Sequence, residues 1–173
     1  MSDLDSVVKP ILTRPVLGHP AQFTLQEQLE IATWACMKAM VFEFAWAQPP
    51  AFTQPEREIV RTQKRPTASA QVRIAAIETQ GYPLRAFRHD YKLHTQEGSE
   101  AVCLTIMIGC FVIQVFGGPG TKQHGLQDLG EIGSDYISIY PPVPNQVSWP
   151  PAVSMTDGAI DDFAHPLSPL TGG

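Results

Sequence analysis

The sequence is poor in charge: Asp, Glu, Lys and Arg make up only 17% of its 173 residues, whereas 43% are hydrophobic. Disordered chains have the opposite balance, so this composition predicts a folded domain with a substantial core. The formal net charge of −5 excludes a bulk attraction of the whole chain to phosphate backbones or anionic membranes. Cysteine is scarce as well. Its three residues lie inside apolar runs without the close spacing of a zinc site, which predicts buried free thiols.

Sorting signals are not visible either. The first residues, MSDLDSVVKP, have no basic flank followed by an apolar core, as a signal peptide would have. Free thiols fit a reducing compartment, so we expect a cytoplasmic protein. We expect no membrane contact, because a spanning helix needs about 20 apolar residues and Glu30, Lys38 and Glu43 interrupt the longest helical run.

The chain also lacks an established catalytic motif. Neither G-x-S-x-G nor H-E-x-x-H occurs, and no acid pair has a catalytic helix spacing. The one compact cluster of metal-capable groups is His89, Asp90 and His94. On a strand, His89 and Asp90 point to opposite faces, and ligands four residues apart stand roughly 13 Å apart. We therefore predict no metal site, no cofactor and no catalytic residue.

The longest helical pattern runs from Thr24 to Trp46 (TLQEQLEIATWACMKAMVFEFAW). Thr24 and Glu27 fit a capping box, in which each side chain accepts a hydrogen bond from a free N–H of the first turn. Pro49 and Pro50 stop the helix because they lack a backbone donor. Apolar residues occupy nearly every face of the pattern, which is typical of a buried central helix.

The segments around this helix are shorter. Residues 1–23 read as an approach segment, in which Asp3 to Val8 form a short helical turn and Pro10 and Pro15 impose an extended path. A second helix starts at Thr53 and runs through about residue 61, and Lys64-Arg65-Pro66 ends it.

Strand patterns follow from residue 70 onward. Residues 70–78 alternate as a half-buried strand, and residues 84–94 alternate again. The apolar run 101–116 exceeds the usual strand length, and Gly109 in its middle predicts a bend between two strands. Tyr136 to Tyr140 is the last predicted strand, because prolines at 141–142 and 150–151 prevent regular pairing. Residues 156–163 predict a short terminal helix capped by Thr156.

Helices first and then antiparallel strands is the order of an α+β protein. We predict one long buried helix and a shorter helix packed on a mostly antiparallel sheet. Residues 1–163 form a single domain, and residues 164–173 form a flexible tail.

Charge is unevenly distributed along the chain. Residues 52–94 hold eight basic and four acidic side chains, whereas residues 95–173 hold one basic and eight acidic ones. Solvated faces of separate elements account for such a pattern without any function. The functional interpretation is a basic surface that neutralises phosphates. Its candidate residues are Arg57, Arg61, Lys64, Arg65, Arg73, Arg85 and Arg88.

A set of short motifs is spread over most of the chain. They are MSDLD at 1–5, VKPIL at 8–12, IATWA at 31–35 with Lys38-Ala39, Gly109 in its apolar run, IYPP at 139–142 and WPP at 149–151. Together they resemble the C-terminal region of bacterial and phage HNH-endonuclease-like proteins. In that family a zinc-ribbon-like nuclease motif precedes a Trp-Met-Ser element, and residues 1–5 look like the continuation of this element.

The family's cysteine pairs and its nuclease His and Asn lie upstream of that element, so no catalytic residue carries over to this chain. Either the start codon lies upstream, or this is a free-standing version of the C-terminal domain. The resemblance implies a non-catalytic binding domain that contacts nucleic acid or a protein partner. Two alternatives stay open: a metal-dependent nuclease with an unrecognised site around His89, Asp90 and His94, and a phage-encoded inhibitor of a host protein.

Overall fold

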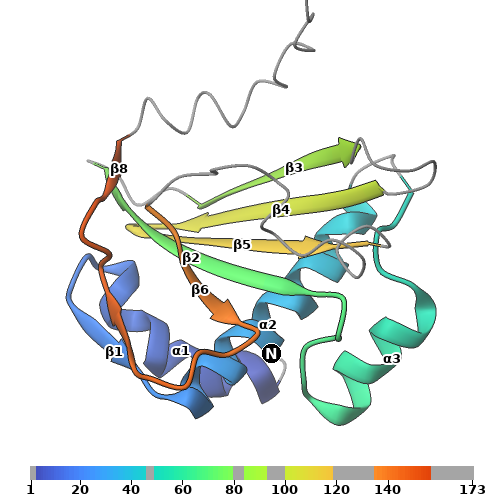
Figure 1. Ribbon diagram of the computed structural model, residues 1–173, viewed down its shortest axis with the longest axis horizontal. Helices are drawn as coiled ribbons and strands as arrows, with labels where there is room; N and C mark the ends of the chain where they lie inside the picture. The colour runs from blue at the N-terminus through green and yellow to red at the C-terminus, as the bar shows by residue number, and fades with distance from the viewer. Residues whose placement is uncertain (1–2, 46–48, 80–83, 93–99, 119–134, 157–173) are drawn as a thin grey trace, which may run out of the picture.

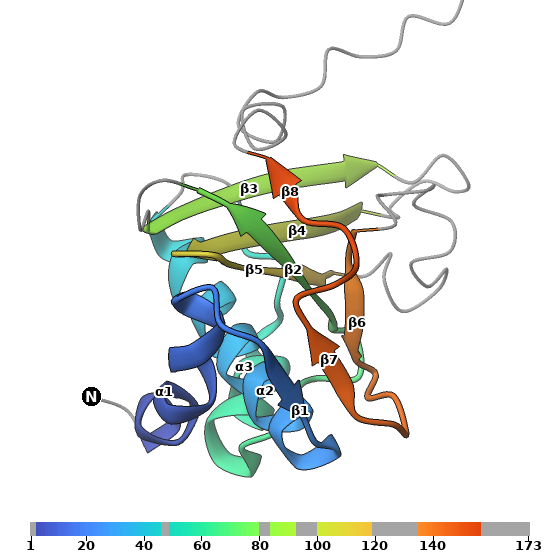
Figure 2. The same ribbon diagram turned by 90° about the vertical axis from the view of Figure 1, so that its left-hand side faces the viewer.

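The computed structural model describes residues 3–45, 49–79, 84–92, 100–118 and 135–156. The helices are α1 (Asp3–Val16), α2 (Leu25–Phe42) and α3 (Gln54–Gln63), and a 3-10 turn (Glu43–Ala45) follows α2. The strands are β1 (Ala21–Phe23), β2 (Gln71–Glu78), β3 (Leu84–Lys92), β4 (Glu100–Ile108), β5 (Phe111–Gly117), β6 (Ile137–Tyr140), β7 (Val147–Trp149) and β8 (Met155–Thr156). The helices lie together on one side of the larger sheet (Figure 1, Figure 2), so the predicted α+β class is confirmed.

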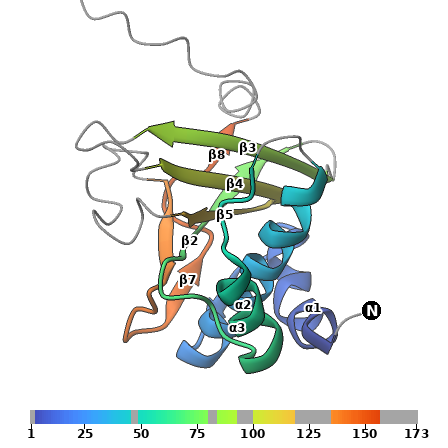
Figure 3. The same ribbon diagram turned by 90° about the vertical axis from the view of Figure 1, so that its right-hand side faces the viewer.

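The larger sheet has the strand order β3-β4-β5-β2-β6, and every neighbouring pair in it is antiparallel. The short strand β8 pairs with β2 in parallel. Strands β1 and β7 form a separate two-stranded antiparallel sheet. Figure 3 looks onto α3, with the larger sheet above the helices.

The hairpin between β4 and β5 confirms the bend predicted at Gly109. Ile108 pairs with Phe111, so only Gly109 and Cys110 lie in the loop. Gly109 has a φ of 56°. Two-residue hairpins favour turns with positive φ because their twist matches that of the strands, and glycine adopts this conformation without a steric cost.

Helix α2 is the central element, as predicted. Thr24 Oγ1 accepts from the backbone N–H of Glu27, whose carboxylate accepts from the backbone N–H of Thr24, so the capping box is present. Six consecutive residues, 31–36, are buried. Six residues cover more than one turn, so every face of the helix is enclosed here. Within the described ranges no helix is both long and apolar enough to cross a membrane.

The sheet is buried on both faces near its centre. On the inner face Ile74, Ile106 and Ile113 pack in the main core, which also contains buried side chains of α1, α2 and α3. On the outer face Ala75, Ile77, Met107, Val112 and Met155 form a second buried cluster. The strand predicted at residues 70–78 is confirmed as β2, but its predicted half-burial is wrong from Ile74 to Ile77, where both faces are buried. Its alternating pattern was broken by small and apolar residues that the second cluster buries.

The helical turn predicted at residues 3–8 lies within α1, but the extended path predicted for Pro10 and Pro15 is wrong, because the helix continues through both prolines to Val16. Leu4, Val8 and Leu12 repeat every four residues and are buried. This amphipathic stripe packs in the main core, and tertiary packing of this kind overrides the low helix propensity of proline.

The tail contains more regular structure than predicted. Tyr136–Tyr140 is not the last strand, because Val147–Trp149 lies between the two proline pairs and pairs with β1. Trp149 is buried and its Nε1–H donates to the carbonyl of Ala75 at 3.2 Å. Thr156 lies in β8 rather than at a helix start. The predicted terminal helix beyond it and the predicted tail at 164–173 lie outside the described residues.

Candidate functional site

Three of the seven predicted basic residues lie together at the end of α3. Arg61, Lys64 and Arg65 are all exposed, and we call them the basic corner. Lys64 has a φ of 51°, the left-handed conformation that ends the helix and turns the chain. The hydroxyl of Thr33 on α2 donates to the Leu29 carbonyl at 2.7 Å and lies 3.4 Å from the Lys64 carbonyl. Helix termination and contact with α2 therefore fix the backbone of the corner.

Arg61 also forms an ion pair within α3. Its Nη2 lies 2.7 Å from Glu58 Oε1, and its side chain is 74% exposed. The hydrogen bond from Arg61 lowers the pKa of Glu58. Exposed pairs between long side chains are weak because water screens them and their ordering costs entropy. A phosphate can therefore replace Glu58 as the partner of Arg61.

A groove of about 500 Å³ lies beside the corner. Lys64, Arg65 and Pro66 form one wall, α1 contributes Asp3, Leu4 and Val7, and α2 contributes Gln26, Leu29, Glu30 and Thr33. The lining thus combines two cations, Lys64 and Arg65, with two acids, Asp3 and Glu30, and several apolar side chains. Lys64 and Arg65 attract an anionic group, whereas Asp3 and Glu30 repel it from the rest of the groove.

Arg57 does not belong to this surface. Its guanidinium forms an ion pair with Glu43, and it donates to the carbonyls of Met40 at 3.0 Å and Phe52 at 3.2 Å. The side chains of Arg57 and Glu43 are only 15% and 3% exposed. The Glu43 carboxylate also accepts from the backbone N–H groups of Ala51 and Phe52. Arg57 therefore fastens the connection between α2 and α3, and a phosphate would have to displace these partners to reach it.

Arg88 is similarly enclosed. Its side chain is 6% exposed, its Nε donates to Asp90 Oδ1 at 2.9 Å, and its Nη2 donates to the Pro49 carbonyl at 2.8 Å. These bonds tie β3 to the chain that follows α2. Arg88 is thus another internal contact.

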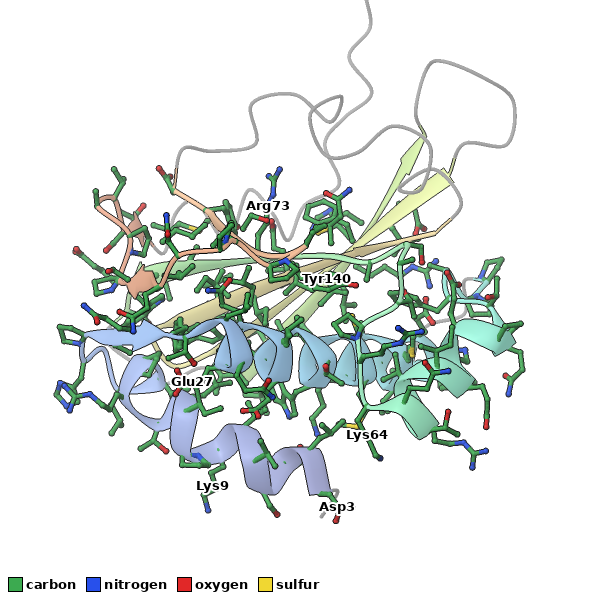
Figure 4. The ribbon with its side chains drawn as sticks, turned by 60° about the horizontal axis from the view of Figure 1, so that its bottom comes forward. Asp3, Lys9, Glu27, Lys64, Arg73 and Tyr140 are labelled. Atoms are coloured by element: carbon green, nitrogen blue, oxygen red, sulfur yellow. The ribbon has the colours of Figure 1, made fainter. Side chains whose placement is uncertain are left out.

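Arg73 and Arg85 lie on the outer face of the sheet. Arg73 pairs in register with Gln114, whereas the neighbouring position Ile74 faces the main core. Figure 4 shows Arg73 on the far side of the sheet from Lys64. Arg85 is exposed and lies on the edge strand β3, which β4 and β5 separate from the strand of Arg73, β2. The seven predicted residues therefore do not form one surface.

The metal-capable residues follow the strand geometry expected from the sequence. Asp90 bonds Arg88 two positions away on its own face, so His89 lies on the opposite face, where it pairs in register with Cys103. In the part of the chain that the structure describes, no three His, Cys, Asp or Glu side chains come together as metal ligands. His94 lies outside that part.

Burial keeps two of the three cysteine thiols, Cys36 and Cys103, in the protonated form. Cys36 and Cys103 are buried, Cys110 is partly exposed, and all three are free. Desolvation raises the pKa of Cys36 and of Cys103 to about 12. Since the thiolate is the nucleophile, neither residue is activated at neutral pH.

Sequence reasoning missed two residues that the structure makes important, Glu43 and Gln114. Each is a polar side chain inside an apolar run, and each is buried. Glu43 holds Arg57, whereas Gln114 lies beside Arg73 on the outer face. The signal that could have identified them is a polar residue within an otherwise apolar run.

Comparison of the chain with protein-family models, with curated proteins and with solved structures gave no match in any of the three. The resemblance to HNH-endonuclease-like proteins therefore stays a prediction.

Proposed function

We propose that this chain is a non-catalytic binding domain that contacts nucleic acid through the basic corner. The observation that carries the proposal is the placement of three exposed cations at the end of one helix, with no buried partner for any of them among the described residues. Such a corner neutralises phosphates without reading sequence.

The contrast within the predicted set supports this choice. Arg57 and Arg88 donate to carboxylates and carbonyls of their own domain. Arg73 lies on the other side of the sheet. Only the corner combines exposure, proximity and a backbone position fixed by neighbouring elements.

The footprint of such a contact is small. Three cations contact about three phosphates, and the acids that line the groove repel an anion from the rest of it. We therefore expect weak, sequence-independent binding that decreases steeply with salt. The resemblance to nuclease-bearing proteins points to the same class of ligand.

Fluorescence anisotropy with a short labelled DNA duplex, and with a single strand of the same sequence, tests the proposal. Substituting all three corner residues by glutamine should weaken binding about tenfold or more. It should also reduce the magnitude of the slope of log affinity against log salt by up to about 2.7, because each phosphate contact contributes about 0.9.

The matched control compares two double variants that lose the same charge. Lys64→Gln with Arg65→Gln removes part of the corner, whereas Lys9→Gln with Arg14→Gln removes exposed cations of α1. Only the first should reduce affinity strongly. Equal losses would show a general effect of net charge, and an unchanged affinity and salt slope in the triple variant would refute the proposal. A protein partner recovered from a lysate after nuclease treatment, without measurable DNA binding, would favour the protein-binding interpretation instead.

A further inference from the structure

A row of polar side chains crosses the outer face of the larger sheet. In register, Ser138 of β6 faces Arg73 of β2, Arg73 faces Gln114 of β5, and Gln114 faces Thr105 of β4. The adjacent row contains Ala75, Val112 and Met107, which belong to the apolar outer cluster. We call Ser138, Arg73, Gln114 and Thr105 the polar row.

Arg73 carries a charge that the described chain does not balance. It is partly buried, and it forms no ion pair with any acid in the described residues. Its guanidinium lies 5.7 Å from the centre of the Phe116 ring. Desolvation lowers the pKa of Arg73, with a partial offset from Cys103 and Tyr136. An aromatic face compensates a desolvated cation only in part, so this position favours an anion.

Gln114 supplies a second unmatched group beside it. The residue is 1% exposed, and its Nε2 donates to Thr105 Oγ1 at 3.2 Å. Its Oε1 is buried and has no hydrogen-bond partner among the residues that the structure describes. Buried side-chain acceptors without a partner are rare in folded proteins, and each one calls for an explanation.

The two unmatched groups are complementary to one ligand. Arg73 offers donors arranged as a planar fork, which matches a carboxylate or a phosphate. Gln114 Oε1 needs a donor, and an ammonium group would be repelled by the neighbouring guanidinium, so a hydroxyl fits better. Because Arg73 is partly exposed whereas Gln114 Oε1 is buried, an anion would approach Arg73 from the solvent side, and a hydroxyl would reach Oε1 only after the side chains that cover this atom move aside.

We propose that the polar row binds a small organic anion with a neighbouring hydroxyl group, with Arg73 pairing the anion and Gln114 Oε1 accepting from the hydroxyl. Hydroxycarboxylates and sugar phosphates share this chemistry. The site is independent of the basic corner, because it lies on the other side of the sheet. A failure of DNA binding at the corner therefore leaves it unaffected.

Nuclear magnetic resonance titration of the full chain tests the site through the Arg73 Nε–H and the Gln114 side-chain NH₂ signals. The probes are glycolate against acetate, which lacks the hydroxyl, and ribose 5-phosphate against ribose, which lacks the anion. We expect saturable shifts of both signals with glycolate, with ribose 5-phosphate or with both, and at least tenfold weaker binding of the matched compound. Binding of only one of the two hydroxyl-bearing anions would identify a carboxylate or a phosphate as the preferred anion.

Arg73→Gln should abolish the saturable shift of Gln114, whereas Arg85→Gln, which removes an exposed arginine of the same face, should change the affinity less than twofold. Gln114→Glu gives Arg73 an internal anion and should also abolish binding, and its dispersed spectrum shows that the fold is kept. Saturable binding that persists in both Arg73→Gln and Gln114→Glu would overturn the proposal. So would the absence of saturable shifts with all four probes.

Discussion

Arg57 and Arg61 lie one helical turn apart on α3, and replacing each by leucine should change the stability by very different amounts. Arg57 contacts Glu43 and two backbone carbonyls in the interior, whereas Arg61 pairs with Glu58 in solvent. Leucine keeps the helix propensity and much of the aliphatic volume. The comparison therefore isolates the guanidinium contacts.

The expected loss for Arg57→Leu is about 3 kcal/mol. Removing one partner of a buried ion pair costs about 3–5 kcal/mol, mostly because the other charge is left buried. The residual 15% exposure of Arg57 places it at the lower end of that range, since some water can reach Glu43. Domains of this kind unfold with about 5–15 kcal/mol. Arg57→Leu should therefore remove a large part of the stability, while Arg61→Leu should change it by less than about 0.5 kcal/mol.

Equilibrium unfolding in urea measures both values, and a double-mutant cycle identifies the cause. Glu43→Gln keeps an acceptor for the backbone N–H groups of Ala51 and Phe52 but removes the charge. Combined with Arg57→Leu it should cost about 1–3 kcal/mol less than the sum of the two single changes. If Arg57→Leu is as stable as the parent protein, or if the cycle is additive, the buried pair does not hold α3 as argued.

Two further stability changes follow from the core. Gly117→Ala should destabilise the fold by about 1–3 kcal/mol in urea unfolding, because the new Cβ would overlap the ring of Phe52. Adding Phe52→Leu to the same chain should restore part of this loss.

Alkaline pH should weaken the fold through Cys36 and Cys103. Burial raises the pKa of both thiols from 9.0 to about 12, so the unfolded chain loses these protons at a lower pH than the folded chain does. The contribution of the two thiols to the free energy of unfolding is therefore complete below pH 9 and decreases as the pH rises toward 12.

The alkaline decrease is measured by urea unfolding between pH 9 and 12, against a variant with alanine at both buried cysteines. That variant should lose less stability with pH, since it lacks the two groups that ionise more readily in the unfolded chain. Equal decreases in the two proteins would assign the effect to other residues.

If Gly117→Ala is as stable as the parent protein, the ring of Phe52 moves aside without cost, and the argument from its contact with Gly117 is wrong.

Much of the fold was predictable because it is specified locally. The capping box of Thr24 and Glu27 fixes where the central helix begins. Its predicted end at Trp46 was too late, because α2 ends at Phe42 and a 3-10 turn follows before the proline pair. Gly109 fixes the hairpin because a two-residue turn needs a positive φ. These signals depend on residues within a few positions of each other, so a single sequence contains them.

The elements that were missed depend on distant partners. Helix α1 contains two prolines, and its formation depends on packing against residues such as Trp34, whose Nε1–H donates to Asp5 at 2.9 Å. Strand β7 is only three residues long and exists because β1, more than a hundred positions earlier, provides its pairing edge. The local sequence of α1 or of β7 therefore does not reveal the distant residues that stabilise it.

The environments of the basic side chains also depend on residues that are distant in the sequence. Arg57, Arg61 and Arg73 are the same residue type within one basic segment of the sequence. Arg57 pairs with the buried Glu43 carboxylate, Arg61 is exposed, and Arg73 is partly buried beside the amide of Gln114. What separates them is the side chain that the fold brings next to each cation. A basic segment in a sequence therefore gives only an upper bound on the number of residues in a binding surface. Polar residues inside apolar runs, Glu43 and Gln114 here, lie beside the arginines that the fold encloses in whole or in part.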